Sequence, residues 1–178
     1  MIAVYGGAFD PIHIGHLSAI YASLYCNDID ELHILPSYNH ANKTNMSCFE
    51  RRVEWLRKVV EAEKKRGGCR EFDKVSVSTI EKDMPKTDMP IYTIDVLNYY
   101  QSLYSSKKIA FITGEDNDIS KYKNADKIKE KYHIIEAKLV LKNCHSSFIR
   151  EGGYELFKTY VPIVITDETY SFYKNKAT

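Results

Sequence analysis

The chain has 178 residues, of which 44% are apolar and 28% are charged. This length suits a single globular domain over residues 1–178, and this composition excludes wholesale disorder. The 25 basic and 24 acidic side chains leave a net charge of +1. A protein that binds nucleic acids or anionic membranes non-specifically normally has a clear positive excess, and this chain has none. No apolar run approaches the roughly 18 residues that a membrane-spanning helix needs.

The amino-terminal residues and the cysteines both indicate a cytoplasmic protein. The chain begins MIAVYGG, without the charged start, apolar centre and cleavage site of a secretory signal. Its four cysteines form no C-x-x-C pair, so neither a structural zinc site nor a disulfide framework is expected. We therefore expect reduced thiols, most of them buried or inert, and no metal bound by the protein alone.

Strand patterns and helix patterns alternate along the chain. Apolar or alternating runs predict strands over residues 2–5, 31–35, 75–80, 109–113 and 138–141. Helical patterns follow over residues 16–25, from 47 to 67, over 93–104 and from 146 onward. This order favours a parallel sheet with helices on both faces, in which ligands bind at the carboxyl ends of the strands.

The helix between residues 47 and 67 has a start signal and a stop signal. The segment SCFE reads as a capping box, in which Ser47 accepts from a first-turn amide and Glu50 reaches back. Gly67 and Gly68 are expected to end the helix.

The segment from Gly6 to His16, GGAFDPIHIGH, follows the first predicted strand and carries the clearest chemical pattern. Its two leading glycines allow a sharp turn and the close approach of a phosphate. His13 and His16 are three residues apart, so they share one face at the start of a helix. Because a helix N-terminus favours an anion, the segment predicts a phosphate-binding site.

This segment resembles the signature of the nucleotidylyltransferase superfamily that carries the H-x-G-H motif. The resemblance implies a Rossmann-like, doubly wound α/β sheet. It also implies transfer of a nucleotidyl group from a nucleoside triphosphate to a phosphate-bearing acceptor. His16 and His13 are then the catalytic residues, with His16 at the α-phosphate and His13 at the β- or γ-phosphate. The ATP-binding residues implied in this segment are Gly7, Ala8, Phe9, His13 and His16.

The segment from His145 to Arg150, HSSFIR, resembles the family motif ISSTxIR. Hydroxyl groups at a helix start offer donors to phosphate oxygens, and an arginine adds a fork of matching charge. The resemblance implies that Ser146, Ser147 and Arg150 bind ATP. His145 replaces the first serine of the motif, and Ser147 replaces its threonine.

Two middle segments resemble the nicotinate and nicotinamide mononucleotide adenylyltransferases. Residues 91–97, IYTIDVL, are similar to SYTIDTL, and residues 111–117, FITGEDN, are similar to F-I-x-G-x-D-N. By this resemblance Tyr92 and Thr93 lie near the pyridine ring of the mononucleotide, and Asp116 lies near the ATP ribose. A carboxylate can accept hydrogen bonds from two sugar hydroxyls.

The resemblance also supplies two candidates for the acceptor phosphate. Residues 39–43, NHANK, occupy the place of the P-P-H-K loop of the family without its prolines, and Lys43 is expected to meet the phosphate. Arg52 matches an arginine on the following helix, with Arg51 as the alternative register.

One aromatic residue of the family is displaced in this chain. The bacterial members usually place a tryptophan shortly after G-x-D, where it stacks on the pyridine. The only tryptophan here is Trp55, inside the helix between residues 47 and 67, where we expect it to pack in the core. Tyr122 is the nearest aromatic residue and is expected to bind the mononucleotide in its place.

The implied reaction joins ATP to nicotinate or nicotinamide mononucleotide and releases pyrophosphate. The acceptor phosphate is already ionised near pH 7, so catalysis needs alignment and charge neutralisation rather than a general base. Mg²⁺ is the expected cofactor, held mainly by phosphate oxygens. The expected partners are these two small molecules, with no nucleic acid and no membrane, and the sequence leaves a homo-oligomer open.

Three alternatives also stay open. Pantetheine-phosphate adenylyltransferases share the two outer motifs, although residues 91–97 and 111–117 favour the pyridine branch. The string HIGH also occurs in class I aminoacyl-tRNA synthetases, but this chain has no K-M-S-K-S string and little room for their additional domains. The third alternative is a nucleotide-binding sensor that has lost catalysis.

Overall fold

The computed structural model describes residues 1–38, 46–84, 90–115, 117–138 and 144–175. In this part of the chain five parallel strands form one sheet in the order β3-β2-β1-β4-β5. The strands are β1 (Ile2–Gly7), β2 (Glu31–Pro36), β3 (Val75–Val77), β4 (Ile109–Gly114) and β5 (His133–Ala137). The chain runs outward from β1 to β3 and then returns to place β4 beside β1.

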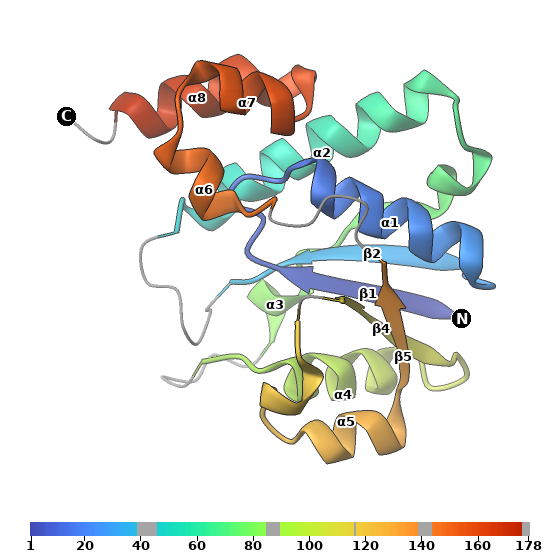
Figure 1. Ribbon diagram of the computed structural model, residues 1–178. Helices are drawn as coiled ribbons and strands as arrows, with labels where there is room; N and C mark the ends of the chain where they lie inside the picture. Colours follow the sequence, from blue (N-terminus) through green and yellow to red (C-terminus); the bar gives the residue numbers. More distant parts are fainter. Residues whose placement is uncertain (39–45, 85–89, 116, 139–143, 176–178) are drawn as a thin grey trace.

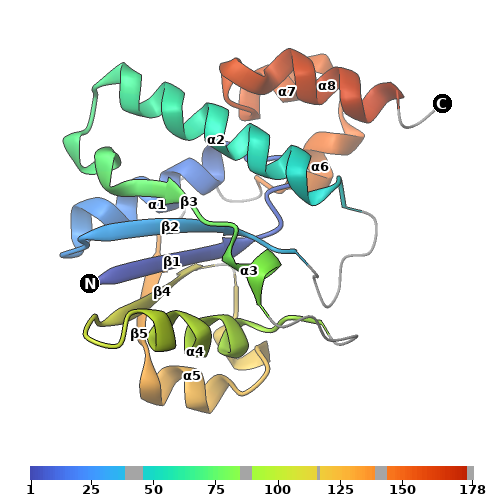
Figure 2. The same cartoon turned by 180° about the vertical axis from the view of Figure 1, so that it is seen from behind.

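Helices cover both faces of the sheet, as the doubly wound prediction requires (Figure 1). One face carries α1 (Ile14–Cys26) and α2 (Phe49–Arg66), and the other carries α4 (Thr93–Leu103) and α5 (Ala125–Lys131). The shorter elements are α3 (Ile80–Asp83), α6 (Ser146–Glu151), α7 (Tyr154–Tyr160), α8 (Thr166–Asn175), η1 (Arg70–Lys74), η2 (Ile119–Lys121) and η3 (Ile163–Ile165). Figure 2 shows α6, α7 and α8 beside α2. No helix within the described ranges has both the length and the apolar character needed to cross a bilayer.

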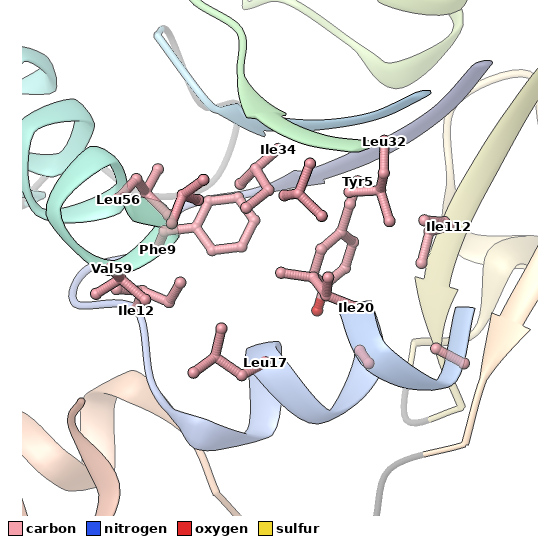
Figure 3. Packing of buried hydrophobic residues seen from close by; sticks show 14 of the residues in the cluster. Tyr5, Phe9, Ile12, Leu17, Ile20, Leu32, Ile34, Leu56, Val59 and Ile112 are labelled. Carbon is pink, nitrogen blue, oxygen red and sulfur yellow. The ribbon is translucent and has the colours of Figure 1, made fainter. Parts of the chain in front are cut away.

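The two-residue period of β1 divides the core into two layers. Ala3 and Tyr5 belong to the layer under α1 and α2, whereas Ile2 and Val4 belong to the layer over α4. Figure 3 shows the first layer, with Ile20 of α1 packed near Tyr5. Because both faces of the strand are buried, a nearly continuous apolar run was the correct signal for a central parallel strand.

The reversal between β1 and β4 creates the crevice in which this kind of sheet binds ligands. The two strands are direct neighbours, with Ile2 opposite Ile109. After β1 the chain passes through Phe9, whose φ is 49°, and a cis peptide bond between Asp10 and Pro11. It then enters α1, so this connection lies over the carboxyl ends of the strands.

Two strand predictions are wrong in their limits. The last strand is β5, His133–Ala137, and not residues 138–141; Lys138 lies outside the strand, and residues 139–141 fall outside the described residues. Two apolar runs follow one another here, and the earlier run both pairs with β4 and buries Ile135 and Ala137. The strand predicted over 75–80 stops at Val77, because the chain turns into α3 at Ile80.

The capping prediction for Ser47 is also wrong. Cys48, not Ser47, precedes the first turn of α2, and Ser47 uses its hydroxyl and its backbone N–H in contacts outside the helix. Of the four cysteines only Cys144 is buried. The stop signal was correct, since Gly67 follows α2 with a φ of 67°.

Two buried ionisable side chains lie near the carboxyl edge of the sheet and have shifted pKa values of opposite sense. His13 is 4% exposed, and burial together with the nearby His145 lowers its pKa to about 4. Glu81 is 7% exposed, and burial raises its pKa to about 7, although the Tyr38 N–H bond and the Arg52 charge oppose the shift. At neutral pH His13 is therefore uncharged.

These shifts predict two opposed contributions to the pH dependence of the free energy of unfolding. Between about pH 4 and 6.5 the unfolded chain binds a proton at His13 that the folded chain does not, so this contribution rises with pH. Between about pH 4.5 and 7 the folded chain keeps a proton on Glu81 that the unfolded chain loses, so this contribution falls with pH. Each is worth about 3 kcal/mol at most.

Single substitutions should expose each contribution. We predict that Glu81→Gln makes the free energy of unfolding rise more steeply between pH 4.5 and pH 7 than in the wild type. His13→Asn should make the same profile flatter or reverse it. Urea denaturation at several pH values measures both slopes, and three parallel profiles would contradict the prediction.

Candidate active site

A cleft of about 1360 Å³ opens at the carboxyl ends of β1 and β4. Its floor includes Gly6 and Gly7 from β1 and Thr113 and Gly114 from β4. One wall comes from the start of α1 and from α6, and the other comes from the start of α4 and the turn after η2. The GGAFDPIHIGH and HSSFIR segments, far apart in the sequence, therefore line one cleft, as predicted.

The two histidines of the first wall lie against each other. The ring centroids of His13 and His16 are 3.7 Å apart. The backbone N–H of His13 donates a hydrogen bond to His16 Nδ1 at 3.2 Å. In the neutral form of His16 the ring proton is therefore on Nε2, which can donate to an anion in the cleft.

Glycine and cysteine neighbours fix the ring of His13. A Cβ placed on Gly15 would approach the His13 ring to 3.0 Å, so a larger residue would push the imidazole out of place. Cys144 Sγ also lies 3.4 Å from His13 Nδ1. This close packing explains the burial that keeps His13 uncharged at neutral pH.

Helix α6 adds hydroxyl groups and a positive charge to the same wall. Ser146 Oγ donates to the carbonyl of Pro11 at 3.0 Å, and Arg150 Nη1 donates to the carbonyl of Asp10. Ser147 is exposed and also lines the cleft. These two bonds hold α6 against the loop after β1. Residues of the GGAFDPIHIGH and HSSFIR segments therefore face the same cleft.

The opposite wall is aromatic and basic. Tyr92 and Thr93, at the start of α4, line it together with Tyr122. Lys123 Nζ lies 3.9 Å from the centre of the Tyr92 ring, a distance at which the ammonium and the ring attract each other. The Tyr122 ring meets Phe111 edge-on, with ring centres 5.7 Å apart. A flat anionic group would find both a ring and a cation here.

Arg52 does not face the cleft, so it is not placed to contact an acceptor phosphate there. Its side chain is 1% exposed and is not among the described residues that line the cleft. Its three donor nitrogens hold the carbonyls of Ser47, Ala8 and Ser37 at 2.8–2.9 Å. The alternative, Arg51, lies over the ring of Phe172. We infer that Arg52 fixes the loops around the site instead of binding phosphate.

The remaining predicted residues have different outcomes. The side chain of Phe9 is 1% exposed and packs among core residues such as Val59, so it does not line the cleft (Figure 3). The expected packing of Trp55 is confirmed by its complete burial. Lys43 and Asp116 lie outside the described residues.

Several side chains at the site were not found from the sequence. Asp10 and Glu81 both line the cleft, and Glu81 accepts the Tyr38 N–H at 2.7 Å. Glu81 follows β3 at the binding edge, a position that could have marked it. Nothing in the local pattern marked Tyr173 of α8, which bonds to Asp10. Within the described ranges no three His, Cys, Asp or Glu side chains come together as a metal-ligand set.

Known proteins with similar sequences carry a common name. A protein of Thermotoga petrophila named "Probable nicotinate-nucleotide adenylyltransferase" is 37% identical over 115 residues, which are 65% of this chain and 52% of that protein. One of Aliarcobacter butzleri with the same name is 32% identical over 139 residues, 76% of this chain and 70% of that protein. The chain spans about half the length of the Thermotoga relatives that it matches.

A solved structure and a family profile agree with the fold. A crystal structure of a protein from Vibrio parahaemolyticus, named "Putative Nicotinate-nucleotide Adenylyltransferase", has a TM-score of 0.70 and 25% sequence identity. The match covers 95% of this chain and 93% of that one. The Cytidylyltransferase-like family matches residues 4–170. With its H-x-G-H loop and its docked HSSFIR helix on one cleft, the chain belongs to the Cytidylyltransferase-like family.

Proposed function

We propose that this chain transfers AMP from ATP to nicotinate mononucleotide, giving the deamido form of NAD and releasing pyrophosphate. The observation that carries the proposal is the cleft itself, where donors from the two ends of the chain face an aromatic and basic wall. Such a cleft suits a triphosphate on one side and a heteroaromatic nucleotide on the other. The names of the relatives favour the same reaction.

The mechanism follows from the donors on the histidine wall. An oxygen of the acceptor phosphate attacks the α-phosphorus of ATP, and the bond between that phosphorus and the pyrophosphate oxygen breaks. We assign His16 to the α-phosphate, because its Nδ1 accepts the backbone N–H of His13 and its ring proton is therefore on Nε2, a donor suited to an anion. His13, Ser147, Arg150 and the backbone N–H of Ser146 bind the β- and γ-phosphates, which leave as pyrophosphate; the Ser146 hydroxyl itself donates to the Pro11 carbonyl. Because the acceptor phosphate is already an anion, no side chain has to remove a proton from it.

Further contacts complete the proposed site. Gly7 and Ala8 let the triphosphate approach the backbone, and Asp116 binds the ribose of ATP. Lys43 binds the acceptor phosphate, and Tyr92, Thr93 and Tyr122 surround the pyridine ring.

Mg²⁺ is the proposed cofactor, carried into the cleft on the triphosphate. The acidic side chains described at the cleft do not form a cage. Asp10 is buried and bonded to Ser47 and Tyr173, Glu81 accepts the Tyr38 N–H, and Asp118 accepts from Ser120. This donor set fits an ion held by phosphate oxygens and water. When bound, the ion would neutralise part of the charge on the phosphates.

The aromatic wall favours the acid form of the acceptor. Lys123 brings a positive charge to the Tyr92 ring, beside which we place the pyridine. A carboxylate on that pyridine can form an ion pair with the ammonium, whereas a carboxamide offers only a neutral oxygen. Nicotinate mononucleotide is therefore the better acceptor.

Pyrophosphate release from ATP in the presence of the mononucleotide tests the reaction. We predict release by the wild type and a loss of at least ~100-fold in kcat for His16→Asn, as for removal of a preorganised donor. Asparagine can still accept the His13 N–H, and a thermal melt checks that the fold survives. Near-normal turnover of the variant would refute the role of His16, and no release by the wild type would favour a sensor.

A lysine substitution tests the choice of acceptor. Lys123→Met should lower the ratio of kcat/KM for nicotinate mononucleotide to kcat/KM for nicotinamide mononucleotide by about tenfold, the value of one charge-assisted hydrogen bond. Lys123→Arg should keep the ratio. Lys127→Met is the control, since Lys127 is exposed on α5 outside the residues lining the cleft. An unchanged ratio in Lys123→Met would contradict the assignment.

A further inference from the structure

Three segments distant in the sequence meet at the buried carboxylate of Asp10, which is 2% exposed. The Tyr173 hydroxyl of α8 donates to Asp10 Oδ1 at 2.6 Å. The Ser47 N–H donates to both carboxylate oxygens, at 3.2 and 3.3 Å. Arg150 Nη1 of α6 donates to the Asp10 carbonyl and lies 3.7 Å from Oδ2, close enough to attract the carboxylate but too far for a hydrogen bond.

The Tyr173 hydroxyl has a fixed direction in this cluster. It accepts a hydrogen bond from Ser47 Oγ at 3.1 Å while it donates to Asp10. Burial and the Asp10 charge both raise the pKa of Tyr173, so the hydroxyl keeps its proton at every physiological pH. Tyr173 is not among the described residues lining the cleft, whereas Asp10 and Arg150 are.

Two anions can compete for the charge of Arg150: the Asp10 carboxylate and, when ATP is bound, the triphosphate. A buried carboxylate is costly unless donors satisfy it. Tyr173 and Ser47 together supply such donors, so the Arg150 guanidinium does not have to close on Asp10 Oδ2. If the hydroxyl were missing, Arg150 would be the cation best placed to replace it, and its charge would be drawn away from the cleft.

We propose that Tyr173 is a positioning residue for ATP: by satisfying Asp10, it keeps the Arg150 guanidinium available to the triphosphate. The inference rests on the proposed function only in taking ATP as the ligand of this wall. It assigns to α8 a role at the site, although that helix supplies no side chain that touches the substrates.

Tyr173→Phe removes the hydroxyl and keeps the ring. It should raise the Kd for a non-hydrolysable ATP analogue, measured by calorimetry, by about tenfold, roughly the value of one hydrogen bond to a charged group. In turnover assays the KM for ATP should rise similarly, while kcat at saturating ATP and the KM for the mononucleotide change by less than about twofold. Tyr170→Phe is the matched control on α8, because the Tyr170 ring packs on Tyr154 and Phe157; it should leave ATP binding unchanged.

A double-mutant cycle separates positioning through Arg150 from a general loss of structure. In an Arg150→Gln background, Tyr173→Phe should have no further effect on the Kd for the analogue, because the side chain that it controls is gone. Equal factors in both backgrounds, or an unchanged Kd in the single variant, would overturn the proposal. If Tyr173→Phe does not fold, Asp10→Asn tests the same competition from the other side. Because it removes the charge that competes for Arg150, it should leave the Kd for the analogue unchanged or lower it, and it should have no effect in the Arg150→Gln background; a raised Kd in the single variant would overturn the proposal.

The binding readout keeps this proposal separate from the proposed reaction. If the wild type binds the analogue but transfers nothing to either mononucleotide, the proposed function fails while the Tyr173 cycle still gives its answer. If transfer proceeds and the cycle is additive, only the role of Tyr173 is refuted.

Discussion

The site depends on one buried cation, the guanidinium of Arg52. Its donors hold backbone carbonyls of Ala8, Ser37 and Ser47, which belong to the loop after β1 and to the chain on both sides of residues 39–45. A guanidinium cannot be discharged in a protein, so burying it requires acceptors on each side. Those acceptors are backbone groups, and the loops that carry them are thereby fixed relative to one another. Loss of Arg52 would leave three carbonyls without their donor at once.

Other buried side chains fix the loops around the cleft in the same way as Arg52, by bonding to backbone groups. The chain reversal between β1 and β4 sets the loops over one crevice, but parallel strands alone leave such loops free to move. Asp10 and Glu81 supply the acceptors for loop N–H groups, at Ser47 and Tyr38. Buried ionisable side chains bonded to backbone groups therefore frame the cleft and fix its loops. This arrangement provides preorganisation without filling the space that the substrates need.

Much of the fold was readable from the sequence because its signals are local. The apolar run of β1, its glycines and the spacing of His13 and His16 lie within sixteen residues, and each was placed correctly. The limits of β5 were missed because two apolar runs adjoin, and only pairing with β4 decides between them. The roles of Arg52 and Tyr173 depend on partners 5 to 163 residues away, which no local pattern encodes. Tyr92 lines the cleft, as the prediction requires, but the cation beside it, Lys123, comes from a turn whose path the sequence does not fix.

The contact between Lys123 and Tyr92 affects the conformational entropy that the lysine side chain loses when it binds an anion. An ammonium on a long, flexible stem normally gives up considerable rotamer freedom and part of its hydration when it pairs with a ligand. The Lys123 side chain is exposed, and its contact with the Tyr92 ring already restricts the positions that its ammonium adopts. When the Lys123 ammonium leaves the ring to bind a carboxylate, it exchanges one partner for another. Its side chain therefore loses less rotamer entropy than that of a lysine with no partner.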